Sequence, residues 1–211
     1  MDYRQAWAVQ EAIHAEVAEG GPERLLLVEH PDVITFGRRG PVAEHLLASK
    51  QSLEQLGVQV VESARGGDVT YHGPGQLVVY PIIRLNDHSL SVGGYVRLLE
   101  NSVIAALAEL GVKAERRDGA VGIWTVDNGK PAKICAIGVR IRRGVSLHGL
   151  ALNVRTDLSR FNLIVPCGLH GANVTSLQKL LGDKAPSMPE VKNAVVRALR
   201  DSLAVPQNQP I

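Results

Sequence analysis

The chain has 211 residues, of which 45% are hydrophobic and 21% are charged, and its net charge is +2. This balance is typical of a folded globular protein and excludes a largely disordered chain. The longest apolar runs, 25–28 and 77–83, are far shorter than the roughly 20 residues that a membrane helix needs, so we expect no membrane partner. The low net charge and an aromatic content of 4% give no indication of nucleic-acid binding.

The beginning of the chain and its cysteines indicate where the protein works. Residues 1–5 contain no basic stretch followed by an apolar core, so a secretory signal is not expected. A secreted protein of this size that relied on disulfides would usually carry more than the two cysteines found here, Cys135 and Cys167. We therefore expect both thiols to be reduced and the protein to be cytoplasmic.

Apolar spacing and turn residues predict the elements of the first part of the chain. Apolar residues recur at helical spacing over 4–19, and Gly20, Gly21 and Pro22 end that helix. Short runs rich in branched residues predict strands. The further elements predicted here are strands at 24–29, 33–36 and 58–62, a turn-rich break at 37–41 and a short helix at 52–56.

The same two periodicities continue in the rest of the chain. Residues 76–83 predict an inner strand, although Pro81 indicates an edge or a bulge at that point. Residues 91–110 predict a long helix that stops at Gly111. The remaining predicted elements are an antiparallel meander at 121–126, 132–141 and 145–154, and a final helix that opens with a capping-box pattern at Ser187–Glu190.

Together these elements predict an α+β fold, with a mixed or antiparallel sheet flanked by helices. No composition shift marks a domain boundary, so we expect a single domain over 1–211. The alternative is that a small C-terminal lobe begins at about residue 170. The tail after Pro206 is expected to fray.

A glycine-rich segment, Arg65–Tyr80, has the densest pattern of small and polar residues. Its glycines let the backbone approach a ligand, and neighbouring amides can hold an anion or a carbonyl. Tyr71 and His72 could bond a substrate carbonyl or orient the backbone, and the alternative for the whole segment is a strand-connecting turn. The histidines of the chain lack the short spacing of a zinc site, so no metal is expected.

The two cysteines occupy different surroundings. Cys167 lies between Pro166 and Gly168, after a predicted strand end, and this tight turn suits a nucleophile. The alternative is that it is a small buried hydrophobe, as free cysteines usually are. Cys135 lies among apolar residues of a predicted strand and is expected to be packing only.

Lys133 is on the same predicted strand as Cys135, where it could simply face solvent. If that strand is internal, its polar face lines a pocket. An ordinary thiol of pKa about 8.5 is only a few per cent thiolate at neutral pH. An ammonium roughly 4 Å away attracts the thiolate by about 4 kcal/mol before desolvation costs and so lowers the thiol pKa. A neutral lysine could instead act as a base, and both roles stay open.

Four segments in this order resemble the octanoyl-(acyl carrier protein):protein octanoyltransferases, enzymes of lipoate biosynthesis. They are Arg65–Gln76, Ala132–Gly138, His148–Asn153 and Pro166–Gly168. The resemblance covers about 25–177, and the combination is much more specific than any one segment. It implies a fold like the catalytic domain of biotin and lipoate protein ligases. Cys135 departs from the family pattern, in which alanine or glycine is expected there, and we interpret it as packing.

The resemblance also implies an activity. Cys167 would take the octanoyl group from the carrier's phosphopantetheine thioester, Lys133 would tune that thiol, and a lysine of a lipoyl domain would attack the resulting thioester. The implied donor is octanoyl-acyl carrier protein, the acceptors are lipoyl domains of 2-oxoacid dehydrogenases and the glycine cleavage H protein, and neither ATP nor another cofactor is needed. The residues implied to line the acyl tunnel and to contact the thioester carbonyl are Arg65, Gly66, Gly67, Asp68, Val69, Thr70, Tyr71, His72, Ala136, Ile137, Gly138, Gly149, Leu150 and Ala151.

Acyl carrier proteins are acidic, which makes three arginine pairs candidate docking sites. The alternative for any single pair is that its charges are simply solvated in a turn. The pairs are Arg38/Arg39, Arg116/Arg117 and Arg142/Arg143.

Two other functions fit parts of the pattern. An ATP-dependent lipoate or biotin protein ligase shares the fold and a lysine near the acyl group, but it has no need of a nucleophilic thiol. A protein that binds acyl carriers or fatty acids without catalysis would need neither Cys167 nor Lys133. The presence of both residues favours the transferase.

Overall fold

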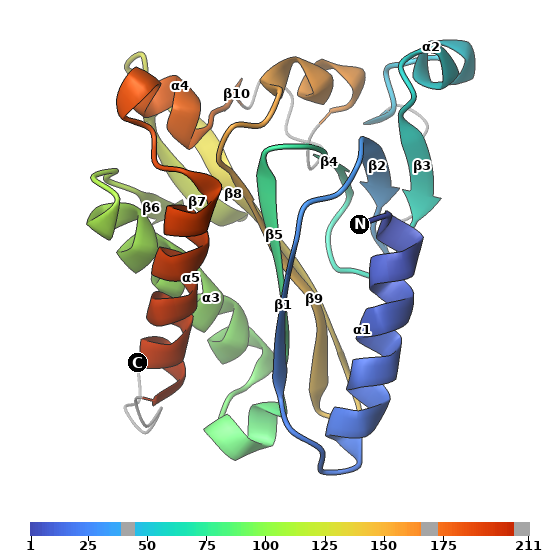
Figure 1. Cartoon of the computed structure of the whole chain (residues 1–211), viewed down its shortest axis with the longest axis vertical. Coiled ribbons are helices and arrows are strands. Elements are labelled where there is room, and N and C mark those ends of the chain that lie inside the picture. The colour runs from blue at the N-terminus through green and yellow to red at the C-terminus, as the bar shows by residue number, and fades with distance from the viewer. Residues whose placement is uncertain (39–44, 166–172, 205–211) are drawn as a thin grey trace.

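The computed structural model describes residues 1–38, 45–165 and 173–204, and its main feature is a seven-stranded sheet (Figure 1). The strand order is β1-β5-β9-β8-β7-β6, and β10 pairs with β8 outside this path; a second, three-stranded sheet has the order β3-β2-β4. The strands are β1 (Arg24–Val28), β2 (Val33–Phe36), β3 (Gln59–Glu62), β4 (Val69–His72), β5 (Gln76–Ile82), β6 (Glu115–Arg117), β7 (Ala120–Asp127), β8 (Lys130–Arg142), β9 (Val145–Asn153) and β10 (Asn173–Val174). The helices are α1 (Tyr3–Ala18), α2 (Lys50–Gln55), η2 (Leu85–His88), α3 (Val92–Glu109), η3 (Leu158–Leu163), α4 (Leu177–Leu181), η5 (Gly182–Lys184) and α5 (Met188–Ala204).

Helices cover both faces of the seven-stranded sheet (Figure 1). On one face, α3 and α5 pack with the sheet into the largest hydrophobic cluster, which includes Leu99, Val195 and Leu199. On the other face, α1 contributes Ala6 and Val17 to smaller clusters with strand residues. Because both faces are covered, inner strands such as β5 are buried at every position.

Successive side chains of β5 point to opposite faces of the sheet. Leu77 and Val79 belong to the cluster under α3 and α5, whereas Val78 and Tyr80 belong to the cluster under α1. The α1 side is therefore where β5 presents Tyr80 with its polar hydroxyl. The small sheet and the start of α1 lie on this same side (Figure 1).

The termini of α1 and α5 follow from local side-chain bonds. The Asp2 carboxylate accepts a hydrogen bond from the Arg4 amide at 2.8 Å and so caps α1. At the start of α5, the Glu190 carboxylate accepts from the Ser187 amide at 2.7 Å and from the Ser187 hydroxyl at 2.6 Å. Of the two bonds of the predicted capping box, the structure thus has the one from the Ser187 amide to the Glu190 side chain.

Most of the predicted elements are confirmed within one or two residues, including the long helix, the final helix and the antiparallel meander β7-β8-β9. The α+β class with a mixed sheet is also confirmed, because β10 runs parallel to β8 and β2 runs parallel to β3. The three strands that the patterns did not predict are β4, β6 and β10. β6 and β10 have only three and two residues, too few for periodicity to show.

Of two predictions about local geometry, one is corrected and one is confirmed in part. Residues 69–72 were expected in a loop, but they form β4 and pair with β2, because Val69, Thr70 and Tyr71 have branched or aromatic side chains that suit a strand. The edge or bulge expected at Pro81 is found as a break on one side only. Pro81 pairs with Leu25 of β1, but its missing N–H interrupts the ladder to β9, which ends at the Val79 to Leu150 pair and resumes at Arg84 to Val145.

Some expectations fall outside the part of the chain that the structure describes. They concern most of the turn at 37–41, the nucleophile Cys167 with its neighbours Pro166 and Gly168, and the tail after Pro206. Among the described helices, none is both long and apolar enough to cross a membrane.

The packing of α5 gives a first prediction. Leu199 is 2% exposed and belongs to the main cluster, so Leu199→Ala should lower the free energy of unfolding by about 2–5 kcal/mol through the cavity that it leaves. Val126→Ala on β7, where the side chain is 63% exposed, is the control and should cost less than about 1 kcal/mol. Urea denaturation of both variants measures the difference, and equal losses would contradict this view of the core.

Candidate active site

The glycine-rich segment begins as a loop bonded to the edge of β8. β7 pairs with β8 only as far as Cys135, so the later residues of β8 have one edge free of β7. The Gly66 amide donates to the Val139 carbonyl at 2.9 Å and occupies this edge. A Cβ on Gly138 would lie 2.8 Å from the Gly66 carbonyl oxygen, so only glycine allows the loop to approach this closely.

Arg65 holds the same loop from its other side. Its guanidinium donates to the Thr35 carbonyl at 2.5 Å, to the Thr35 hydroxyl at 3.0 Å and to the Gly66 carbonyl at 3.0 Å. The side chain is buried, and these bonds connect the loop to β2 of the small sheet. The loop is therefore fixed between the two sheets.

The three predicted binding segments meet around one cavity. The segment 65–70 with His72 forms one wall, and the other comes from β8 and β9, where Ala136 to Gly138 pair with Gly149 to Ala151 in register. The cavity is predominantly apolar. The structure thus brings together all the predicted binding residues except Tyr71.

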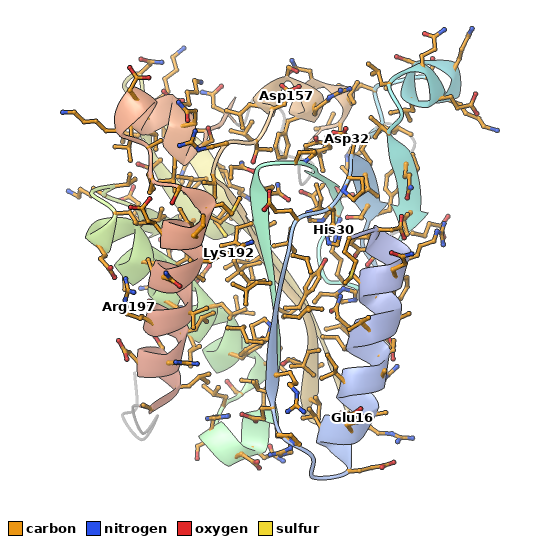
Figure 2. All side chains as sticks on the ribbon, in the orientation of Figure 1. Glu16, His30, Asp32, Asp157, Lys192 and Arg197 are labelled. Carbon is orange, nitrogen blue, oxygen red and sulfur yellow. The ribbon has the colours of Figure 1, made fainter. Side chains whose placement is uncertain are left out.

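Tyr71 points away from this cavity. Its hydroxyl donates to the Asp32 carboxylate, and its ring packs edge-on against Phe161 at a centroid distance of 5.3 Å. Asp32 lies near β2 and the start of α1 (Figure 2), and it is also 3.9 Å from the Arg160 guanidinium. Tyr71 thus contacts Asp32 and Phe161 and does not line this cavity, and its predicted role in substrate binding stays a prediction.

Four residues that were not among the predicted binding residues also line the cavity: Tyr3, Val78, Tyr80 and His148. Val78 and Tyr80 occupy alternate positions of β5, and this spacing could have indicated their common face. Tyr3 stacks on His72 at 5.8 Å, although 69 residues separate them in sequence. No local pattern predicts such a contact.

His148 reaches the cavity through an unusual backbone conformation. By alternation with Leu150 and Leu152 it should face α3, but its φ is +58°, and its ring lies near Trp7 and Tyr80 on the α1 side. The side chain is 1% exposed, and neither ring nitrogen has a hydrogen-bond partner among the residues that the structure describes. The buried, unpaired ring of His148 is therefore part of the cavity wall in the described structure.

Burial keeps the cavity histidines neutral. It lowers the pKa of His72 to about 3 and that of His148 to about 4, with the nearby Arg65 guanidinium acting in the same direction. His72 Nδ1 is also hydrogen-bonded to the side-chain oxygen Oε1 of Gln76 at 2.7 Å, and Gln76 Nε2 in turn donates to Asn153 Oδ1 at 2.9 Å. At neutral pH the wall is thus polar in places but carries no imidazolium.

Lys133 lies at a second cavity that adjoins the first. It is 7% exposed on β8, its Nζ donates to the Val121 carbonyl at 3.0 Å, and its ammonium lies 5.0 Å from the centre of the Trp124 ring. The two cavities share the wall formed by Gly66, Gly67, Asp68, Ile137 and Gly138. The lysine is thus next to the apolar cavity but outside its lining.

Cys135 is confirmed as a packing residue. It is fully buried in the main cluster, and burial raises the pKa of its thiol to about 12. A thiol with that pKa has almost no thiolate at neutral pH, so Cys135 cannot serve as a nucleophile.

The two ends of the segment that carries Cys167 are anchored at different places. Before it, the Val165 amide donates to the His45 carbonyl at 2.9 Å. After it, Val174 in β10 pairs with Lys133, and the Thr175 amide donates to the Lys133 carbonyl at 3.0 Å. Val174, which follows Cys167 in the sequence, thus lies directly beside Lys133.

The arginine pairs lie in different surroundings. Arg142 is bound to Glu11 at 2.5 Å, and Arg39 is outside the described residues. Arg117 lies 4.9 Å from the centre of the Trp124 ring, the same ring that Lys133 approaches.

In the described part of the chain, no group of three or more His, Cys, Asp or Glu side chains could hold a metal ion.

Comparison with known proteins agrees with this geometry. The model of the lipoyl protein ligase A/B catalytic domain matches residues 2–200. An octanoyltransferase of Chloroflexus aggregans is 50% identical over 201 residues, which cover 94% of this chain and 89% of the relative. An octanoyltransferase of Nitratidesulfovibrio vulgaris is 45% identical, covering 93% of this chain and 88% of the relative.

Solved structures show the same fold at low identity. A lipoate-protein ligase A bound with ATP superimposes with a TM-score of 0.79 at 20% identity, covering 99% of this chain and 84% of the ligase. A bi-partite lipoate protein ligase of Thermoplasma acidophilum gives a TM-score of 0.72 at 18% identity, covering 92% of this chain and 79% of that protein. The predicted similarity to the lipoate ligase fold is therefore confirmed.

The neutral histidines predict a pH dependence of stability. The unfolded chain takes up these protons near pH 6.5, while folded His148 does so only near pH 4, so stability is full above pH 6.5 and falls between these values. Each such histidine contributes a slope of up to about 1.4 kcal/mol per pH unit. His148→Asn, which tolerates the left-handed backbone, should remove one such slope in urea denaturation at pH 4–7. An unchanged slope would contradict the burial of a neutral ring.

Proposed function

The chain belongs to the octanoyltransferase family of lipoyl protein ligase A/B catalytic domains, and on this premise we propose that it carries octanoyl from acyl carrier protein to a lysine of a lipoyl domain. The chain is an acyltransferase by this membership. In the proposal Cys167 is the nucleophile and Lys133 its partner. The acceptors are lipoyl domains of 2-oxoacid dehydrogenases and the glycine cleavage H protein, and the reaction takes place in the cytoplasm.

The observation that carries the proposal is a buried lysine beside a predominantly apolar cavity. A cavity between the glycine-rich loop and the β8-β9 pair offers apolar surface to an acyl chain, which gains about 0.8 kcal/mol for each buried methylene. The neighbouring cavity, which Lys133 lines, leaves the reactive end of that chain next to an ammonium. We place the acyl chain in the first cavity and the thioester at the wall between the two.

The contacts of Lys133 support its role as a cation. The Val121 carbonyl accepts from its Nζ, and the face of Trp124 lies 5.0 Å away, and both contacts stabilise an ammonium. A cation beside a thiol favours the thiolate, which is the reactive form. Between the two roles that the sequence left open, these contacts favour the charged form over the neutral base.

The two half-reactions then use one site. In the first, the Cys167 thiolate attacks the carrier's thioester carbonyl, a new C–S bond forms, and the phosphopantetheine sulfur leaves with the electron pair of the broken bond. In the second, the amine of the acceptor lysine attacks the Cys167 thioester, an amide forms, and the cysteine sulfur leaves. Both are exchanges at one acyl carbon, so neither requires ATP.

The arginine pair next to the lysine fits the docking of the donor. Arg117 shares the Trp124 ring with Lys133, so an acidic carrier that docks at Arg116/Arg117 would face the cavity that Lys133 lines. Arg142, by contrast, is already bound to Glu11. We therefore prefer Arg116/Arg117 among the three pairs.

The covalent intermediate gives the most direct prediction. With octanoyl-acyl carrier protein and no acceptor, the protein should gain one hydroxylamine-labile octanoyl group in intact mass. Cys167→Ser should show no such adduct, and Lys133→Met, which keeps the bulk without the charge, should form it at least about tenfold more slowly. If instead Cys167→Ser retains full activity that requires ATP and free acid, the protein is a ligase and the proposal fails.

The shape of the acyl cavity gives a second prediction. Ala151 lines it and pairs with Ala136, so Ala151→Leu should fill the space of the chain's far methylenes. The preference for octanoyl over hexanoyl carrier should fall by about tenfold or more, because one methylene is worth roughly 1–3 kcal/mol in such a pocket. Ala108→Leu on the exposed side of α3 is the control and should leave the ratio unchanged. An unchanged ratio in Ala151→Leu would place the acyl chain elsewhere.

A further inference from the structure

Asp68 lies in the wall shared by the two cavities and forms a pair with His45, and this pair has no part in the steps above. The His45 Nδ1 is 2.6 Å from Asp68 Oδ2, and the Asp68 side chain is 5% exposed against 18% for His45. Asp68 lines both the acyl cavity and the cavity of Lys133. A buried carboxylate in this position is costly unless something binds it.

The second oxygen of that carboxylate is unpaired in the part of the chain that the structure describes. Oδ1 of Asp68 is buried and has no hydrogen-bond partner in the described ranges 1–38, 45–165 and 173–204. A carboxylate oxygen accepts only, so whatever completes it must bring an N–H or O–H group. Because Asp68 lines both cavities, a ligand that enters them comes close to this carboxylate.

His45 connects this pair to the nucleophile's segment. Its carbonyl accepts from the Val165 amide at 2.9 Å, and the adjacent Leu46 forms a bridge with Ile164. His45 is thus held on one side by the chain that leads to Cys167 and on the other by the glycine-rich loop. An imidazole side chain can serve as a general base in a proton transfer.

We propose that Asp68 binds the ammonium of the acceptor lysine and that His45 removes its proton before attack. This inference rests on the proposed function, because it concerns the second half-reaction of the same site. The acceptor is preferred over the donor as the partner of Asp68 because a lysine brings a cation with three N–H donors. The acidic carrier and its neutral pantetheine amides gain less from a buried carboxylate.

Bonds and protons are conserved when the acceptor lysine attacks. The acceptor's ammonium gives one proton to the neutral His45 imidazole, and the imidazolium is stabilised by Asp68. The free amine attacks the carbonyl carbon of the Cys167 thioester, a C–N bond forms and the C–S bond breaks. The second proton of the attacking nitrogen passes to the cysteine sulfur. The products are the amide, the Cys167 thiol and a protonated His45, which then releases its proton to water.

The test compares the rates at which a preformed octanoyl-enzyme reacts with two different nucleophiles. The acyl-enzyme is prepared with octanoyl-acyl carrier protein and freed of carrier, and its single-turnover decay is followed with a lipoyl domain or with hydroxylamine at pH 7. Hydroxylamine is neutral at this pH, so it needs no carboxylate and no base. The ratio of the two rates therefore reports on the activation of lysine, however much acyl-enzyme each variant forms.

Asp68→Asn should lower the ratio of lysine transfer to hydroxylamine cleavage by at least about tenfold, and His45→Gln should do the same, because a positioned base contributes roughly 100-fold or more. Asp201→Asn on the exposed side of α5 is the control and should leave the ratio unchanged. Should Asp68→Asn fail to fold, His45→Gln provides the same comparison from the more exposed side of the pair.

Two results would overturn the inference while leaving the proposed function in place. In one, both variants transfer to lysine with the wild-type ratio. In the other, lysine transfer and hydroxylamine cleavage fall together, which indicates a structural role for the pair. If wild-type protein forms no acyl-enzyme, the proposed function itself fails, and this inference fails with it.

Discussion

The site depends on the length of β8 relative to its neighbour β7. β8 continues past the last β7 pair at Cys135, and its free edge binds the glycine-rich loop through the Gly66 amide. Both cavities are built on this one strand, because Lys133 comes before the point of divergence and Ala136–Gly138 come after it. A shorter β8 would leave the loop without an anchor and the lysine without an adjoining acyl cavity.

Glycine is required on β8 and β9 for more than the size of the cavity. A Cβ on Gly149 would lie 2.1 Å from the Val79 carbonyl, and one on Gly138 would meet the backbone of Gly66. These positions therefore keep neighbouring backbones in contact as well as leaving room for a chain. Ala136 and Ala151, which pair across the two strands and line the cavity, are better places to tune its length.

Sequence patterns predicted the fold class and the segments of the site, and their limits have physical causes. Periodicity found the helices and the meander because α3, α5 and β7–β9 each bury a regular face. It missed β4 because glycines on both sides of residues 69–72 mark a loop, and it could not find Tyr3 or the side of His148. The position of Tyr3 depends on its stacking with His72, which is distant in sequence, and the side of His148 depends on its left-handed backbone conformation. Tyr71 lies outside the cavity lining because strand alternation turns it toward Asp32.

The proposed mechanism requires that Cys167, and not Cys135, carries the octanoyl group. Peptide mapping tests this most directly. Trypsin separates the cysteines, since Cys135 falls in the peptide 134–140 and Cys167 in 161–179. After brief reaction with octanoyl-acyl carrier protein and digestion at mildly acidic pH, tandem mass spectrometry should find the octanoyl group on Cys167 in 161–179, with 134–140 unmodified. An octanoyl group on Cys135, whose buried thiol has a pKa raised to about 12, would contradict the account of the site.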